Sequence, residues 1–172
     1  MKRIFLLIGL ILTISLSSQK VPTGIIASQK ATASAPSANM ISNGTFDSGT
    51  GWDFWEGQPQ GWSIAGGVAT FDDINSGARL RQADADMVSP IQINTAYTIE
   101  FDISGLTSNT ADILINNYAN AVGYVTWGNY GNGHHVVQFT SPADVGVGGI
   151  VFIANDTSGS SFSLDNLTLT AD

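Results

Sequence analysis

Apolar and polar residues alternate along many short segments of the chain, and a period of two predicts β-strands. The clearest example is YTIEFDIS at 97–104, where aromatic and aliphatic residues alternate with Thr, Glu, Asp and Ser. One face of such a strand packs on a core and the other meets water. Turn-forming residues separate the segments, and none has the period of an amphipathic helix. The ranges predicted as strands are 40–42, 62–65, 68–72, 78–82, 97–104, 112–116, 122–126, 135–140, 149–154 and 161–170.

The last predicted strand changes its alternation halfway. Phe162 and Leu164 share one parity, whereas Leu167 and Leu169 share the other. A β-bulge near Asp165 would bring all four side chains to the same side, because a bulge inserts one extra residue into a strand. About ten short antiparallel strands in one domain predict an all-β fold of the sandwich type rather than a parallel sheet.

The N-terminal residues have a different pattern. Lys2 and Arg3 precede the run 4–16, which is almost wholly apolar. This is typical of a secretory signal peptide, and a membrane-spanning helix takes about 20 apolar residues. We therefore predict a signal peptide at 1–19, a flexible linker rich in Ala, Ser, Thr and Pro at 20–39, and a domain at 40–172. The protein is expected to be secreted or at the cell surface, and membrane-anchored if its N-terminal segment is retained uncleaved.

Charge is distributed unevenly along the chain. The only bases after residue 39 are Arg79 and Arg81, against all 14 acidic residues, so residues 40–172 have a formal net charge of −12. A surface of this charge repels phosphate backbones and anionic membranes, so we expect no nucleic-acid partner. A neutral ligand, or a cation held by carboxylates, is more compatible. The absence of cysteine excludes disulfides, thiolate metal sites and cysteine nucleophiles.

Three motifs, taken in order, resemble one family. NGTFD at 43–47 is followed by a Gly-Trp pair, YTIEFDISG covers 97–105, and FSLDNLTL covers 162–169. They resemble the jelly-roll carbohydrate-binding modules of the family 4, 9 and 22 type, including the galactose-binding-like sandwiches close to them. The resemblance implies a jelly-roll β-sandwich that binds a polysaccharide or cell-surface glycan without catalysis. The alternative is a structural surface, adhesion or virion decoration protein, anchored by its N-terminal segment, that uses the sandwich for contacts with protein partners.

The same resemblance implies a structural Ca²⁺. In the family, an acid just after the first strand and an acid in the last strand help to bind the ion, and the matching residues are Asp47 and Asp165. Calcium takes oxygen ligands and accepts backbone carbonyls from glycine-rich turns. The alternative interpretation is local, with Asp47 capping a turn and Asp165 lying at a bulge.

Most of the Trp and Tyr residues lie in or beside polar, glycine-rich stretches. Sugar rings pack their C–H faces on indole and phenol rings, while nearby Asn, Gln and Asp bond the hydroxyls. We expect Trp52 and Trp62 to close the sandwich instead. Tyr124 and Trp127 should face opposite sides of a regular strand, so at most one of them reaches a given ligand. The candidate ligand-binding residues are Trp55, Trp127, Tyr130, Tyr124 and Tyr118, and exposure is expected above all for Trp55, Trp127 and Tyr130.

The sequence does not predict an enzyme. Glu100 and Asp102 share a strand face with their carboxyls about 6–7 Å apart, near the lower end of the inverting-glycosidase range. Jelly-roll glucanases carry E-x-D-x-x-E on such a strand, but here the third position is Gly105. The simpler interpretation of these acids is a solvated strand face, on which Arg79 and Arg81 could form cross-strand ion pairs with them. A third interpretation is that these polar residues line a sugar-binding groove. His134 and His135 are adjacent on a strand and face opposite sides, so they do not chelate one metal.

Overall fold

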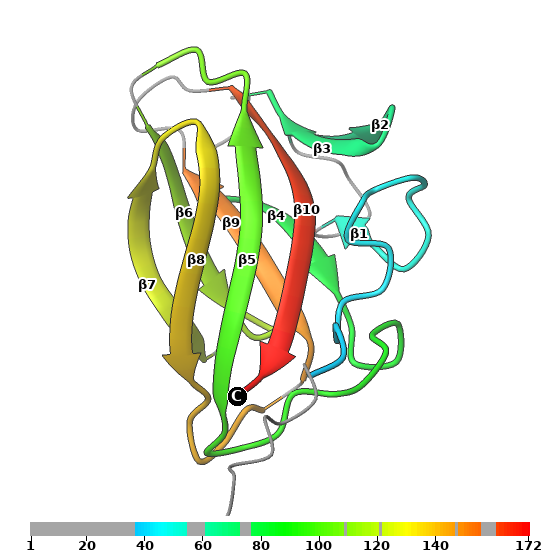
Figure 1. Ribbon diagram of the computed structural model, residues 1–172, viewed down its shortest axis with the longest axis vertical. Helices are drawn as coiled ribbons and strands as arrows, with labels where there is room; N and C mark the ends of the chain where they lie inside the picture. The colour runs from blue at the N-terminus through cyan, green and yellow to red at the C-terminus, as the bar shows by residue number, and fades with distance from the viewer. Residues whose placement is uncertain are drawn as a thin grey trace, which may run out of the picture. The chain divides into compact units, whose positions relative to one another are not determined.

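The fold is a sandwich of two five-stranded antiparallel sheets (Figure 1). The computed structural model describes residues 37–54, 61–72, 77–108, 110–120, 122–146, 148–155 and 161–172. Sheet A has the strand order β1-β4-β9-β6-β7 and sheet B the order β2-β3-β10-β5-β8. The strands are β1 (Asp53–Phe54), β2 (Trp62–Ala65), β3 (Val68–Phe71), β4 (Ala78–Gln82), β5 (Ala96–Ser104), β6 (Ala111–Asn116), β7 (Gly123–Tyr130), β8 (Gly133–Thr140), β9 (Ile150–Asn155) and β10 (Phe162–Ala171).

The all-β prediction is confirmed, since every regular element within these ranges is a strand. The same ranges contain no helix long and apolar enough to cross a membrane. Nine of the ten predicted segments coincide with strands, although β7 continues to Tyr130, beyond its predicted end. The signal peptide and most of the linker lie outside the described residues and stay predictions.

The predicted strand at 40–42 is wrong, and β1 was missed. The segment at 40–42 runs beside β10, where Met40 N donates to Leu169 O at 2.8 Å, but it forms no ladder. Leu169 N in turn donates to the side chain of Asn39, Oδ1, at 3.0 Å. β1 consists of Asp53 and Phe54 alone, and two residues are too short to show an alternation.

Two tryptophans close the sandwich, as predicted. Trp62 is 1% exposed, and its ring lies 5.5 Å from the ring of Phe71 and 5.6 Å from that of Phe162. Its indole Nε1 donates to Ala78 O at 3.1 Å, which satisfies the one polar atom of the side chain. Trp52 is also buried and packs on Phe46, with 5.1 Å between ring centroids.

β10 contains the predicted bulge. Its pairing with β5 shifts between Asp165 and Thr168, and Asn166 has a φ of +50°. The extra residue restores the inward direction of the later apolar positions. Leu164, Leu167 and Leu169 are consequently all buried in one core cluster.

The Asn-Gly pair of the first motif holds the N-terminal segment against β10. Leu167 N donates to Gly44 O at 2.9 Å, and a Cβ at Gly44 would lie 2.0 Å from Leu167 O. Only glycine allows two backbones to approach so closely. Asn43, with a φ of +51°, donates from Nδ2 to Ser48 O and Thr50 O at 2.5 and 3.2 Å. The motif therefore closes a loop and seats it on the last strand.

Candidate functional site

The outer face of sheet A, opposite to the core, carries both arginines of the domain. Along β4, Ala78 and Leu80 enter the core cluster, so Arg79 and Arg81 point outward. Antiparallel register extends this face across the sheet, because paired residues share a side. We define the outer face of sheet A by Asp53, Arg79, Arg81, Asp112, Leu114, Asn116, Trp127, Val151 and Ile153.

Aliphatic side chains form the floor of this face. Val151 and Ile153 are 0% and 4% exposed, yet neither belongs to the core cluster between the sheets. Val151 pairs with Arg81 on one side, and Ile153 pairs with Arg79 on one side and Leu114 on the other. We infer that long neighbouring side chains cover these two residues on the outward side.

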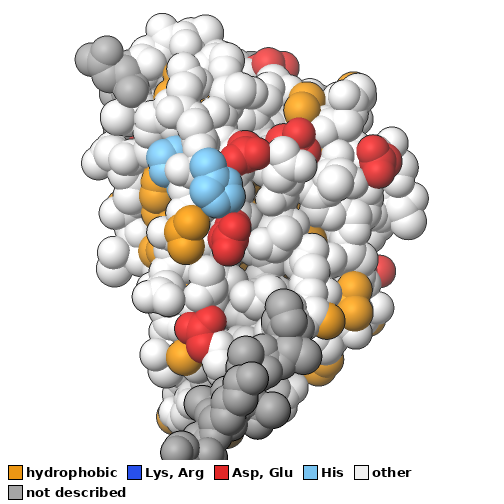
Figure 2. All heavy atoms as spheres, viewed as in Figure 1, with side chains coloured by type: hydrophobic (Ala, Val, Ile, Leu, Met, Phe, Trp, Pro, Cys, Tyr) orange, Lys and Arg blue, Asp and Glu red, His pale blue; other side chains and the backbone are white. Residues whose placement is uncertain are grey.

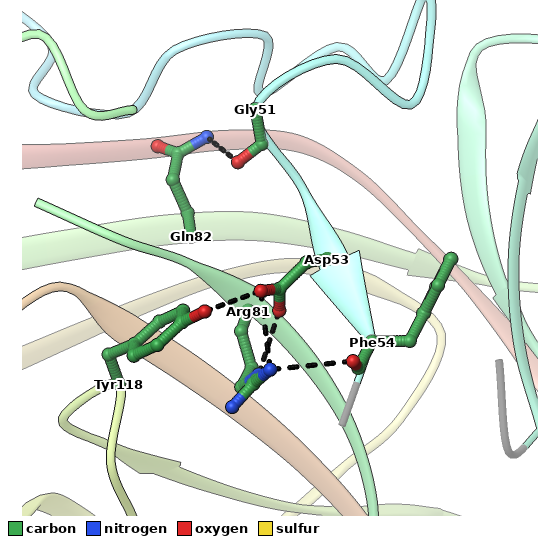
Figure 3. Close-up of polar contacts among 6 residues, drawn as sticks. All are labelled: Gly51, Asp53, Phe54, Arg81, Gln82 and Tyr118. Carbon is green, nitrogen blue, oxygen red and sulfur yellow. Dashed lines mark hydrogen bonds and ion pairs between the residues drawn. The ribbon is translucent and has the colours of Figure 1, made fainter. Parts of the chain in front are cut away.

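A polar network lies across one end of the face (Figure 3). Arg81 donates from Nε to Asp53 Oδ1 at 2.7 Å and from Nη2 to Asp53 Oδ2 at 3.2 Å. Tyr118 donates its hydroxyl to Asp53 Oδ2, and Arg81 Cζ lies 4.4 Å from the centroid of the Tyr118 ring. The bond to Asp53 raises the pKa of Tyr118, so the phenol stays a neutral donor. The network ties edge strand β1 and the β6–β7 turn to β4.

Gln82 supports this end of the face from the core side. It is fully buried, and its Nε2 donates to Ser42 O at 2.9 Å. The same atom donates to Gly51 O at 3.4 Å (Figure 3). Its Oε1 accepts from Ser42 N at 3.1 Å. These bonds fix the loop that leads into β1, and so the position of Asp53.

Trp127 lies on the same face at edge strand β7. The pairing of β6 with β7 shifts between Ile113 and Ile115, so two residues of β7 lie opposite Leu114. These two residues are Trp127 and the residue before it. Leu114 alternates with core residues and points outward, and Trp127 does the same. The indole is 45% exposed, which confirms the predicted exposure. An accessible indole therefore lies across from an aliphatic floor.

The other aromatic candidates are placed differently. Tyr118 is held by the network just described. Tyr124, a candidate ligand-binding residue, is buried, stacks on Phe139 at 5.4 Å and belongs to the core cluster. Tyr130 is only partly exposed, because its ring packs edge-on against Phe101 at 5.2 Å, and this burial raises the pKa of its phenol. Trp55 lies outside the described residues.

The outer face of sheet B carries the acidic pair considered in the sequence. His134 Nδ1 lies 2.8 Å from Asp102 Oδ1, and its Nε2 lies 3.3 Å from Glu100 Oε2. Asn166 Nδ2 donates to Asp102 Oδ2 at 2.8 Å, and this bond, followed by that of His134, lowers the pKa of Asp102. Figure 2 shows histidine and acidic side chains gathered on this face. The option of an ion pair between these acids and the arginines is wrong, because Arg79 and Arg81 lie on the other sheet.

The two histidines divide as predicted. His134 is exposed, whereas His135 is partly buried with its ring 5.5 Å from that of Phe101. His135 Nε2 also lies 2.8 Å from Gly131 O. The described residues contain no group of three or more His, Cys, Asp or Glu able to hold a metal ion.

The structure gives Asp47 and Asp165 local partners. Asp47 Oδ2 accepts from Thr45 Oγ1 at 2.9 Å, and Asp165 Oδ1 accepts from Asn166 N at 2.6 Å. The two residues lie in segments that meet at the Gly44–Leu167 contact. Two carboxylates supply only part of the oxygen ligands that Ca²⁺ takes, and backbone carbonyls would have to supply the others. The calcium site stays a prediction, and the function proposed below does not depend on it.

Calcium binding at Asp47 and Asp165 has a measurable consequence. Free Ca²⁺ at about 100 times its Kd is expected to stabilise the fold by about 2.7 kcal/mol, because the ion binds the folded state only. Melting in calcium and in excess chelator measures the shift, and Asp47→Asn should abolish it. Equal melting temperatures in both solutions would show that Asp47 and Asp165 do not form a calcium site.

No family model matches this chain, and no curated protein matches it. Solved structures do. A family 4 carbohydrate-binding module, CBM4, is 19% identical, with a TM-score of 0.54 over 74% of this chain and 100% of that chain. The CBM22-1 xylan-binding domain from Paenibacillus barcinonensis Xyn10C is 12% identical, with a TM-score of 0.51 over 80% and 97%. The chain therefore has the β-sandwich fold of carbohydrate-binding modules.

Proposed function

We propose that this domain binds a glycan, without catalysis, on the outer face of sheet A. The observation that carries the proposal is Trp127, an exposed indole that shares a sheet face with aliphatic Leu114 and Ile153 and with fixed polar groups. A sugar ring can place its C–H face on the indole, and hydroxyls can bond to groups such as Asp53 and Arg81. The carbohydrate-binding neighbours, one of them named for xylan, support this assignment.

The dimensions of the face suit a short chain of sugars. It crosses β4, β9, β6 and β7, and neighbouring strands are about 4.8 Å apart, so it extends about 14 Å across the strands. Residues two apart on one strand are separated by about 7 Å, which sets the spacing between the row of Arg79 and the row of Arg81. An oligosaccharide lying across the strands would contact Trp127 at one side and β4 at the other.

The placement of the acids supports binding rather than hydrolysis. Glu100 and Asp102 are on the outer face of the opposite sheet, and both are engaged by His134. On the outer face of sheet A, Asp53 is occupied by Arg81 and Tyr118. Asp112 also lies on this face, but its strand β6 is three strands from β1 in the sheet. A glycosidase needs two carboxyl groups that flank one bond, and a backbone separation of about 14 Å is wider than that arrangement.

Trp127→Ala tests the proposal. We expect affinity for a bound polysaccharide to fall at least about tenfold, because truncating an aromatic side chain that anchors a ligand costs about 2 kcal/mol. The melting temperature should change little, since the indole is 45% exposed. Affinity electrophoresis in gels containing neutral or uronic-acid polysaccharides measures retention, and circular dichroism measures melting.

Val136→Ala is the matched control for this variant. Val136 is 57% exposed but lies on β8 of sheet B, so its truncation should leave retention unchanged. If Trp127→Ala loses both folding and binding, the indole stabilises the fold and is not shown to contact the ligand. Failure of the wild-type domain to bind any member of a broad glycan array would favour the structural alternative, a surface protein with protein partners.

A further inference from the structure

The carboxylate of Asp53 accepts hydrogen bonds on both oxygens and has capacity for one more. Its Oδ1 accepts from Arg81 Nε at 2.7 Å, and its Oδ2 accepts from Arg81 Nη2 at 3.2 Å and from the hydroxyl of Tyr118 (Figure 3). An ionised carboxylate has about four acceptor sites, two on each oxygen. The described donors use both sites of Oδ2 and one site of Oδ1, so the second site of Oδ1 remains for another donor. The side chain of Asp53 is 45% exposed, so such a donor can come from solvent.

Arg81 and Tyr118 hold this carboxylate in one orientation. The two bonds from Arg81 have the paired geometry that planar guanidinium and carboxylate groups favour, and the side chain of Arg81 is only 12% exposed. The ring of Tyr118 covers the guanidinium, with 4.4 Å between Arg81 Cζ and the ring centroid. An acceptor that is already fixed loses little conformational freedom when a ligand binds. Asp53 therefore offers a pre-oriented acceptor on the outer face of sheet A.

The charge of the network determines which donor it accepts. The positive charge of Arg81 compensates the negative charge of Asp53 at 2.7 Å, so the pair attracts no counter-charge of its own. A sugar hydroxyl has a hydrogen to donate to Oδ1, whereas a ligand carboxylate is an acceptor only and would be repelled by the oxygens of Asp53. The remaining acceptor site therefore favours a hydroxyl.

Asp53 and Trp127 lie on opposite edge strands of the same face. β1 and β7 end the order β1-β4-β9-β6-β7 and are four strand spacings apart, which is about 19 Å. The aliphatic residues Val151, Ile153 and Leu114 lie on the strands between them. A ligand that contacts both Asp53 and Trp127 must therefore be a chain of several sugars that crosses the strands.

We propose that Asp53 is a second ligand-contacting residue of this face, that it receives a sugar hydroxyl on Oδ1, and that Arg81 and Tyr118 are positioning residues for its carboxylate. This inference rests on the proposed function and adds the class of ligand. The ligand is a glycan chain long enough to reach from Trp127 to Asp53, with a free hydroxyl where it meets Asp53. A disaccharide would contact only one of the two edge strands.

The length of the ligand provides the first test. Oligosaccharides of increasing length from xylan, a β-glucan and a mannan are titrated into the wild-type protein in a calorimeter. We expect the affinity in at least one series to rise about tenfold or more at the length that first spans the two edges, because a hydrogen bond to a charged group contributes that much. Asp53→Ala should remove this rise and leave the affinity for shorter members unchanged. Val136→Ala, on the other sheet, should bind like the wild type throughout.

Tyr118→Phe tests the positioning role. It removes the hydroxyl that donates to Asp53 but keeps the ring on Arg81, so the variant should fold like the wild type. We expect its affinity for the spanning oligosaccharides to fall about threefold or more, because the carboxylate loses one of its fixed donors. The double variant Asp53→Ala, Tyr118→Phe should bind no more weakly than Asp53→Ala alone, since Tyr118 acts through Asp53. A residue that only stabilised the fold would instead give additive losses.

The possible results separate the two proposals. If Asp53→Ala binds the longest oligosaccharides like the wild type while Trp127→Ala does not, this inference is overturned and glycan binding stands. Additive losses in the double variant overturn the positioning role of Tyr118. No binding of any oligosaccharide or parent polysaccharide to the wild type overturns both proposals. If the melting curve shows that Asp53→Ala does not fold, the wild-type series decides alone, and the absence of a rise in affinity with length overturns the inference.

Discussion

Trp62→Ala is expected to lower the free energy of unfolding by about 3–5 kcal/mol, the range found for truncating a large buried aromatic side chain. Trp62 is 1% exposed and contacts the rings of Phe71 and Phe162. The substitution leaves a cavity at the end of the sandwich and removes the indole bond to Ala78 O. Because small domains are stable by only about 5–15 kcal/mol, the variant would lie close to the limit of folding.

Urea denaturation followed by tryptophan fluorescence and circular dichroism measures this loss. Trp127→Ala is the control, because it removes the same side chain from an exposed position and should cost far less. A loss below about 1 kcal/mol for Trp62→Ala would show that Trp62 does not close the core.

Gly44→Ala is expected to cost about 3 kcal/mol or more, although it adds a single methyl group. The new Cβ would lie 2.0 Å from Leu167 O and 3.0 Å from Leu167 C, both of them backbone atoms with no rotamer to change. The two segments must separate, which strains the bond from Leu167 N to Gly44 O. Overpacking costs about 1–3 kcal/mol and a lost hydrogen bond about 1 kcal/mol more.

Gly49→Ala provides the control in the same loop. Nothing lies within 4 Å of a Cβ at Gly49, so its stability should stay within about 0.5 kcal/mol of wild type. Thermal and urea melting of the two variants side by side make the comparison. Equal stability of both would show that the loop does not press on β10.

The fold could be predicted because its signals are local. Alternation in 97–104 marks β5, and the change of parity around Asp165 marks the bulge, since both depend only on which side each residue faces. β1 escaped prediction because two residues carry no period. The predicted strand at 40–42 failed because the backbone there makes bonds to β10 without the regular ladder of a strand.

The candidate site was only partly predictable, because it depends on the pairing of distant strands. Nothing local in the sequence says that Asp53, Arg81 and Tyr118 meet, since they belong to β1, β4 and the β6–β7 turn. Trp127 was identified from its polar surroundings. Tyr124 has similar neighbours, and its parity places it opposite to Trp127, but the sequence does not say which of the two faces meets the core.

The position of β10 has a consequence for how the domain is made. β10 is the last strand in the chain, yet it lies in the middle of sheet B between β3 and β5, and the segment around Met40 and Gly44 bonds to it. During synthesis, β3 and β5 lack the strand that pairs with both of them until residues 162–171 have left the ribosome. Contacts between such distant segments also make folding slow, since the loop must close first. Sheet B of the nascent domain therefore stays incomplete until the residues of β10 have been synthesised.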